Sequence, residues 1–112
     1  MTPLLTEFGL GTSLRRHDHT EAACRAVRDA LWRNSINVAE LFGRPKADMR
    51  VAVEIGARAP EAVDRDAVAA CFPYGTVTVS VVEGGLDMPR PDGDGAPTVM
   101  VVAAITVSLE GV

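Results

Sequence analysis

The segment Thr98–Leu109 constrains the fold more than any other part of the chain, because it carries no charge and is apolar on both of its alternating faces. A strand with this pattern is typical of the centre of a sheet that is covered on both sides. A chain of 112 residues has room for one modest core. We therefore expect residues 1–112 to form a single domain built around this strand.

Three other segments predict strands. Residues 3–8 have the composition of a short strand, and apolar and polar residues alternate over residues 49–55 and 76–83. Residues 9–12 have the composition of a glycine-rich exit from the first strand. Residues 87–97 are rich in Pro, Gly and Asp, which is typical of a loop before the last strand. The chain thus supplies four strands for one sheet.

Helical segments separate the first three strands. Apolar residues at helical spacing predict a helix over residues 19–34, and Asp18 and Glu21 before and within it have the spacing of a capping box. Shorter helical segments are expected at residues 38–42 and within residues 60–72. The order βαβαββ predicts an α+β two-layer sandwich, in which helices cover one face of a mixed sheet.

The composition excludes several classes of partner. The formal net charge is −4 and no basic block occurs, so nucleic acid is not an expected partner. No apolar run reaches transmembrane length, and the first residues lack the pattern of a signal peptide, so we expect no membrane partner and a cytoplasmic location. Cys24 and Cys71 are too few for a disulfide scaffold and are expected to be reduced.

The face of the sheet away from the helices is predicted to meet another protein subunit. It combines small hydroxyl side chains with aliphatic ones, which suits a protein interface better than bulk water. Its expected members are Glu54, Thr78, Ser80, Met100, Val102, Ala104, Thr106 and Ser108. A small chain with only 4% aromatic residues also has little core of its own, which favours a homo-oligomer.

Glu83, Gly84 and Gly85 at the end of the third strand form a candidate pocket rim. A carboxylate at a strand end is rigidly held, and glycines let backbone N–H groups approach a small ligand closely. A glycine turn after an edge strand explains the same residues without a ligand. Both interpretations stay open.

Glu7 is a second candidate carboxylate, since it also falls near a strand end. If the first and third strands bring Glu7 and Glu83 into one pocket, one of them can serve as a proton donor or acceptor. Alternatively, each pairs with a nearby arginine. Tyr74, in a Pro-Tyr-Gly turn, is a candidate ligand contact, although a tyrosine in such a turn is more typically a surface anchor.

The loop before the first helix is basic. Arg15 and Arg16 precede a helix N-terminus, where guanidinium and N–H groups suit a carboxylate or phosphate; a solvated basic loop is the alternative. His17 and His19 flank Asp18 and could hold a metal ion, but no third ligand lies at a recognisable spacing. Solvated histidines are therefore favoured, and neither a metal nor a cofactor is expected.

Five motifs resemble those of a bacterial family of conserved hypothetical proteins, the Lin family. They are Glu7-Phe8-Gly9-x-Gly11, Thr20–Ala30 with Asn34-Ser35, Val63-Asp64-x-Asp66-Ala67-Val68, Phe72-Pro73-Tyr74-Gly75 and Val82-Glu83-Gly84-Gly85-Leu86. The family is similar in layout to chorismate-mutase-like and YjgF-like trimers and to the domains of cyclic-amide hydrolases such as cyanuric acid hydrolase. The resemblance implies a homotrimer with pockets between subunits.

The loop before the first helix departs from the family pattern. Family members carry Asp-x-His-Gly-Gln-Asp-x-Thr-Lys-Ala-Ala where this chain has residues 13–23, so the family's His, Gln and Lys fall at Arg15, His17 and Glu21. An activity that needs the lysine is therefore not expected from this chain, which suggests either another substrate or a partnership with a lysine-containing relative.

Two functions follow as hypotheses. The first is a hydrolase-like enzyme with intersubunit pockets that acts on a small anionic or cyclic-amide metabolite. In it Glu7 and Glu83 supply acid–base chemistry, and the backbone of Gly84 and Gly85 contacts a carbonyl oxygen. Its substrate-binding side chains are Arg15, Arg16, His17, Glu21 and Tyr74. The second is a non-catalytic ligand-binding or assembly subunit.

Overall fold

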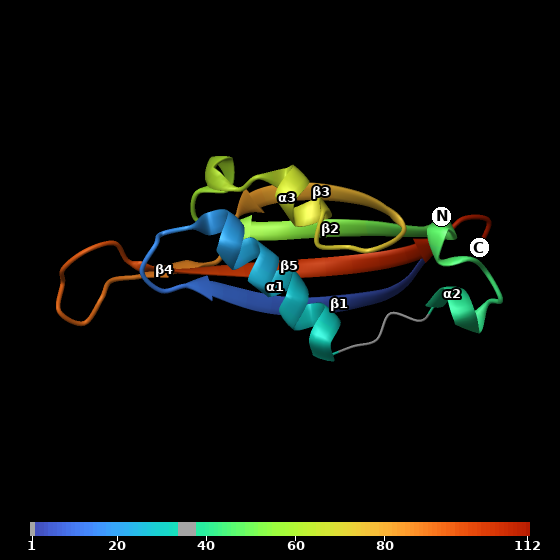
Figure 1. Ribbon diagram of the computed structural model, residues 1–112, viewed down its shortest axis with the longest axis horizontal. Helices are drawn as coiled ribbons and strands as arrows, with labels where there is room; N and C mark the ends of the chain where they lie inside the picture. Colours follow the sequence, from blue (N-terminus) through green and yellow to red (C-terminus); the bar gives the residue numbers. More distant parts are fainter. Residues whose placement is uncertain (1, 34–37) are drawn as a thin grey trace.

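The computed structural model describes residues 2–33 and 38–112. It contains a five-stranded mixed sheet with strand order β1 (Pro3–Ser13), β5 (Thr98–Leu109), β2 (Met49–Ala57) and β3 (Thr76–Glu83). The short strand β4 (Leu86–Met88) pairs with β5 beyond the point where β2 ends. Figure 1 shows the helices α1 and α3 on one face of this sheet. The predicted α+β organisation is confirmed, and β4 is an additional strand.

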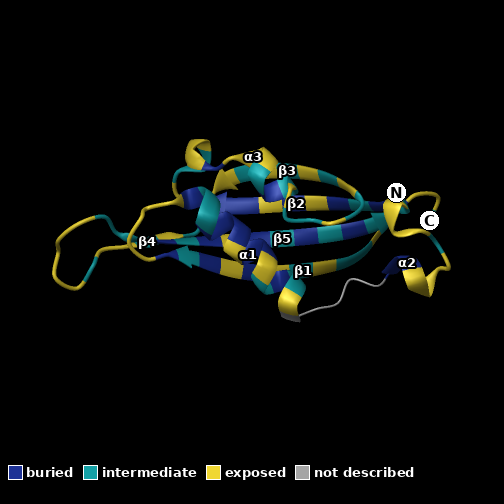
Figure 2. Ribbon diagram, in the orientation of Figure 1, coloured by how far each residue is buried: buried dark blue, intermediate teal, exposed yellow. Residues whose placement is uncertain are grey.

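Strand β5 lies in the centre of the sheet, as its apolar sequence predicts. It is antiparallel to both β1 and β2, while β2 and β3 are parallel. The residues of β5 that face the helices are almost fully buried, and those on the other face keep part of their surface exposed (Figure 2). The sequence predicts that β5 is covered on both faces. Within one chain, however, the helices cover only one face of the sheet, because they all pack their apolar sides against that face.

Strand β1 is longer than the sequence predicts, because residues 9–12 continue the strand and do not leave it. Gly9 and Gly11 lie directly under helix α1 (His19–Arg33). A Cβ atom at Gly11 would overlap the carbonyl oxygen of Ala22, and one at Gly9 would overlap that of Ala26. These glycines are therefore packing positions that let the alanine-rich stripe of α1 rest on the strand.

Helix α1 begins where the capping motif predicts; its expected end at residue 34 lies outside the described residues. The Oδ1 atom of Asp18 accepts a hydrogen bond from the N–H of Glu21 at 2.9 Å. The other half of the capping box is not formed: the N–H of Asp18 donates to Ser13 Oγ at 3.1 Å, and the carboxylate of Glu21 pairs with Arg25 Nε at 3.2 Å. Ser13 thus ties the loop to the end of β1.

The remaining helices are short. They are α2 (Val38–Leu41), α3 (Arg65–Ala69) and the 3₁₀ helices Lys46–Asp48 and Pro60–Ala62. Asp64 caps α3 by accepting from the N–H groups of Asp66 and Ala67 at 3.0 and 3.2 Å. Among the described residues, no helix is long and apolar enough to cross a membrane.

The two cysteines are free and lie where α1 meets the α3 segment. Both thiols lie near the carbonyl oxygen of Ala67, at 3.8 Å for Cys24 and 3.6 Å for Cys71. Burial, with the neighbouring Cys71 thiol as a further cause, raises the pKa of Cys24 to about 12. Cys24 is therefore a protonated, unreactive core residue at neutral pH.

Candidate functional site

One end of the sheet gathers most of the predicted site residues. Strands β1, β2 and β3 run in the same direction, because β1 and β2 are each antiparallel to β5 and β3 is parallel to β2. Their carboxyl ends therefore meet at one end of the molecule, at the left of Figure 1. The loop 14–18 and the segment Glu83–Gly85 both follow strands that end there.

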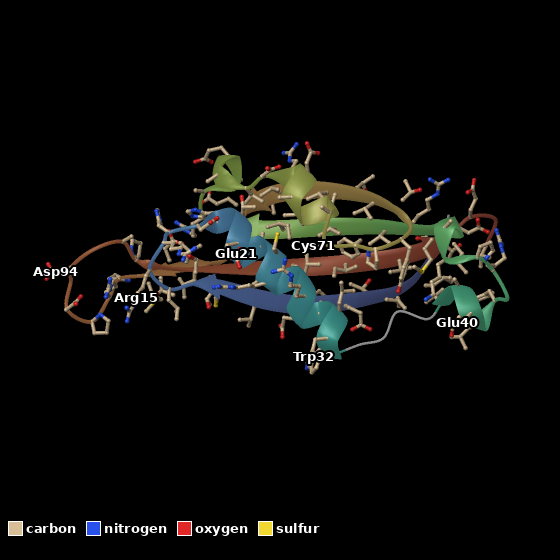
Figure 3. All side chains as sticks on the ribbon, in the orientation of Figure 1. Arg15, Glu21, Trp32, Glu40, Cys71 and Asp94 are labelled. Atoms are coloured by element: carbon tan, nitrogen blue, oxygen red, sulfur yellow. The ribbon has the colours of Figure 1, made fainter. Side chains whose placement is uncertain are left out.

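An open hollow of about 500 Å³ lies between this loop and the first turns of α1. Its lining residues are Ser13, Leu14, Arg15, Arg16, Glu21 and Arg25. Figure 3 places Arg15 and Glu21 at this end of the molecule. Arg25 is the positioned member of the set, because its Nη1 atom donates to the carbonyl oxygen of Thr12 at 2.7 Å and its Nε atom pairs with Glu21.

Arg15 and Arg16 differ from Arg25 because their guanidinium groups have no partner among the described residues. Both are exposed, and within the described residues neither makes a hydrogen bond or an ion pair. The hollow therefore holds three guanidinium groups and a single carboxylate, that of Glu21, which leaves a local excess of positive charge. An acidic chain that concentrates arginines around one hollow is suited to binding a small anion there.

A second, smaller hollow of about 290 Å³ contains Glu83. Its lining residues are Phe8, Glu54, Gly56, Val82, Glu83, Gly84, Val102, Ala103 and Ala104. Glu83 also pairs with Arg58 at 3.3 Å, as one interpretation of the sequence predicted; both side chains are well exposed, so the pair contributes little stability. Glu54 was expected on this face of the sheet but not as a catalytic residue. A carboxylate among the apolar residues of β2 is the pattern that could have indicated a functional role.

Glu7 and Glu83 are not brought together within one chain. Glu7 lies on β1 opposite Ile105, whereas Glu83 ends β3 at the other edge of the sheet. Strands β5 and β2 stand between them, and adjacent strands are about 4.8 Å apart. A shared pocket for these two carboxylates therefore does not exist in the single chain.

Tyr74 is also remote from the arginine hollow. It precedes the first residue of β3, at the opposite end of that strand from Glu83. Its ring is half-buried, and the Nζ atom of Lys46 lies 4.8 Å from the ring centroid. This arrangement is that of a packed surface residue with a cation–π contact.

Gly84 and Gly85 connect β3 to β4. The N–H of Gly84 donates to the carbonyl oxygen of Ala57 at 3.0 Å, and Gly85 has a φ of +70°. A Cβ at Gly85 would overlap the carbonyl oxygen of Met100. The backbone geometry alone requires a glycine at position 85, so the turn interpretation is sufficient to explain Gly85. Gly84, in contrast, also lines the second hollow.

His17 and His19 lie at the start of α1, and neither belongs to the lining of the arginine hollow. His17 is exposed, whereas His19 is buried, with an exposed fraction of 4%. The expectation that both are solvated loop histidines is therefore wrong for His19, which is buried as the first residue of α1.

Comparisons with known proteins agree with this fold. Comparison with the curated proteins found no match. A crystal structure from Nostoc punctiforme PCC 73102, described as that of an FtsZ-like protein of unknown function, is 31% identical in sequence to this chain. The similarity covers 98% of this chain and 97% of the other, with a TM-score of 0.87. A family model for conserved hypothetical proteins matches residues 3–107, and the chain therefore belongs to the Lin0512 family.

Proposed function

We propose that this protein binds a small anionic metabolite in the hollow formed by the loop 14–16 and the first turns of α1. The observation that carries the proposal is the presence of Arg15 and Arg16, two arginines without a partner among the described residues, beside the positioned Arg25. Guanidinium groups bind carboxylate or phosphate oxygens in pairs, and a helix N-terminus adds N–H groups of the same polarity. Ionised cyclic imides present similar oxygen atoms and belong to the same ligand class.

The proposal predicts a selective loss of anion affinity when the unpaired arginines, Arg15 and Arg16, are replaced. Arg15→Ala combined with Arg16→Ala should weaken binding by at least about 100-fold, since each of the two lost charge-assisted hydrogen bonds contributes about 1.5 kcal/mol or more. Isothermal titration calorimetry at fixed ionic strength measures this with inorganic phosphate, citrate and barbiturate as probes. Their number of charges and shapes differ, so the best probe indicates the ligand class.

Arg65→Ala is the control, because Arg65 is an exposed arginine on α3 that does not line the hollow. It removes one positive charge and should leave anion affinity within about twofold. Equal losses in the control and in the double variant would mean that net charge alone governs binding, and the proposed site would then be wrong. Absence of saturable binding by any of the three probes would have the same consequence.

An enzymatic function of the second hollow is a further candidate, favoured by the presence of Glu54 and Glu83 in one lining. The hollow opens on the uncovered face of the sheet, where large apolar side chains are exposed. They are Phe8, Leu10, Val82, Leu86, Met88 and Val102. A second copy of the chain that covers this face would exclude water from the carboxylates, in a homotrimer of the chorismate-mutase-like or YjgF-like kind.

Two substitutions separate assembly from chemistry in this second candidate. Leu10→Glu, at a position with 51% exposure, should dissociate the oligomer without unfolding the chain, and turnover of a cyclic amide should fall with it. Glu83→Gln should lower turnover at least about 100-fold while the oligomer persists. Native mass spectrometry and hydrolysis of barbiturate are the two measurements. A wild-type monomer, or unchanged turnover in Glu83→Gln, would refute the candidate; binding without turnover fits a non-catalytic subunit, alone or with a relative.

A further inference from the structure

Three potential metal ligands converge where α1 meets β4. One ligand atom each from His17, His19 and Asp87 lies within 4.8 Å of the other two. The imidazole rings of His17 and His19 have their centroids 4.8 Å apart at an interplanar angle of 68°. The two histidines are two residues apart at the start of α1, but Asp87 comes from a distant part of the sequence and completes the set only in the folded chain.

Two polar atoms of this cluster are buried without a partner. His19 Nε2 and Asp87 Oδ1 are both inaccessible, and neither makes a hydrogen bond within the described residues. Leaving a buried polar atom unpaired costs about 1–3 kcal/mol, so two such atoms in one cluster of side chains are unusual in a native structure. A ligand that both atoms coordinate would remove this cost.

The fold explains how these residues meet. Asp87 lies on β4 opposite Val99, and Val99 in turn lies opposite Ser13 at the end of β1. Ser13 anchors the loop through the N–H of Asp18, which places the start of α1 above this row of strands. His17 has a φ of +53°, a left-handed conformation that is uncommon for residues other than glycine and is found at functional sites.

We propose that His17, His19 and Asp87 bind a divalent transition metal ion, with Zn²⁺ as the preferred species. Imidazole nitrogens with one carboxylate oxygen suit Zn²⁺ and disfavour Mg²⁺, which takes oxygen ligands. Tetrahedral Zn²⁺ with bonds of about 2.05 Å holds its ligand atoms about 3.3 Å apart. The exposed His17 side chain must therefore move inward when the ion binds, and three protein ligands leave a fourth position for water.

Two carboxylates offset the positive charges near this position. The positive end of the α1 dipole opposes a bound cation by about 0.3–1 kcal/mol at most. Asp87 places a carboxylate in the ligand set, and Asp18 caps the same helix end with a second one. Arg15 and Arg16 precede the site but are exposed to solvent, where their repulsion is screened. The site is a separate inference from the anion hollow and does not depend on it.

The test is Zn²⁺ binding by protein first stripped with EDTA. Equilibrium dialysis with elemental analysis should find one Zn²⁺ per chain and no Mg²⁺ at the same concentration. His17→Asn removes an exposed imidazole and keeps a residue that tolerates positive φ, and Asp87→Asn is nearly isosteric. Each should weaken Zn²⁺ binding at least about tenfold. Asp94→Asn in the exposed loop after β4 is the matched control and should bind Zn²⁺ like the unaltered protein.

Substitution with Co²⁺ distinguishes this site from the cysteine pair. The visible spectrum of the Co²⁺ protein should show nitrogen and oxygen ligation and lack thiolate charge-transfer bands. Zn²⁺ binding that survives both His17→Asn and Asp87→Asn, or that disappears in Cys71→Ser, would overturn the proposal. So would a failure to bind Zn²⁺ more tightly than Mg²⁺. Phosphate titration of EDTA-treated His17→Asn shows separately whether the anion hollow remains functional.

Discussion

Gly11→Val should lower the free energy of unfolding by about 3–5 kcal/mol, the largest loss that we predict for a single substitution in this protein. Much of the chain should then be unfolded at 37 °C. A Cβ at this position meets the carbonyl oxygen of Ala22 and the amide nitrogen of Ala26, which are backbone atoms of α1. No side-chain rotation relieves such an overlap, so the helix must lift from β1 and expose the core. Urea denaturation followed by circular dichroism measures the loss, with Gly11→Ala as the milder step of the series.

Thr12→Val is the control for that series. Thr12 is the next residue of β1 and lies on the uncovered face, opposite Met100, where valine suits a strand. Its free energy of unfolding should stay within about 0.5 kcal/mol of the unaltered protein. If Gly11→Ala were as stable as Thr12→Val, the close packing of α1 on β1 would be wrong.

Gly85→Ala should cost about 2–5 kcal/mol. The left-handed φ of +70° accounts for about 1–2 kcal/mol in a residue with a side chain. The overlap of the new Cβ with the carbonyl oxygen of Met100 adds about 1–3 kcal/mol, because β4 would have to separate from β5. Thermal denaturation at equal protein concentration measures the combined effect.

Gly93→Ala isolates the conformational part of this effect. Gly93 has a similar φ of +76°, but a Cβ there would meet open space. Its substitution should cost only about 1–2 kcal/mol. Equal losses at the two positions would show that Gly85 serves the turn conformation alone and that the close approach to Met100 has no energetic consequence.

Much of the fold is predictable from local patterns. The uncharged, apolar segment Thr98–Leu109 predicted the central strand, and the spacing of Asp18 to Glu21 predicted the start of α1. The end of β1 was misjudged at Gly9 and Gly11. A Gly-x-Gly pattern is equally compatible with a strand end and with a strand that lies under a packed helix. Only the position of α1 distinguishes the two.

The candidate sites depend on contacts between distant segments, and these limited the prediction. The sequence indicates Arg15 and Arg16 as candidates because the loop and the helix they precede are local features, and both residues line one hollow in the structure. Asp87 was assigned to a loop, because a strand as short as β4 has no periodicity of its own. Its approach to His19 follows from the pairing of β4 with β5, which no local pattern encodes. The separation of Glu7 from Glu83 likewise follows from strand order.

The most direct test of the proposed function is an NMR titration of ¹⁵N-labelled protein with inorganic phosphate, run in EDTA so that the metal site is silent. Binding in the arginine hollow predicts saturable amide shifts centred on residues 13–16, Glu21 and Arg25, the segments that line it. These shifts should disappear in the variant that combines Arg15→Ala with Arg16→Ala. Shifts that do not saturate, or that centre on Glu83–Gly85 while the hollow stays unchanged, would contradict the account.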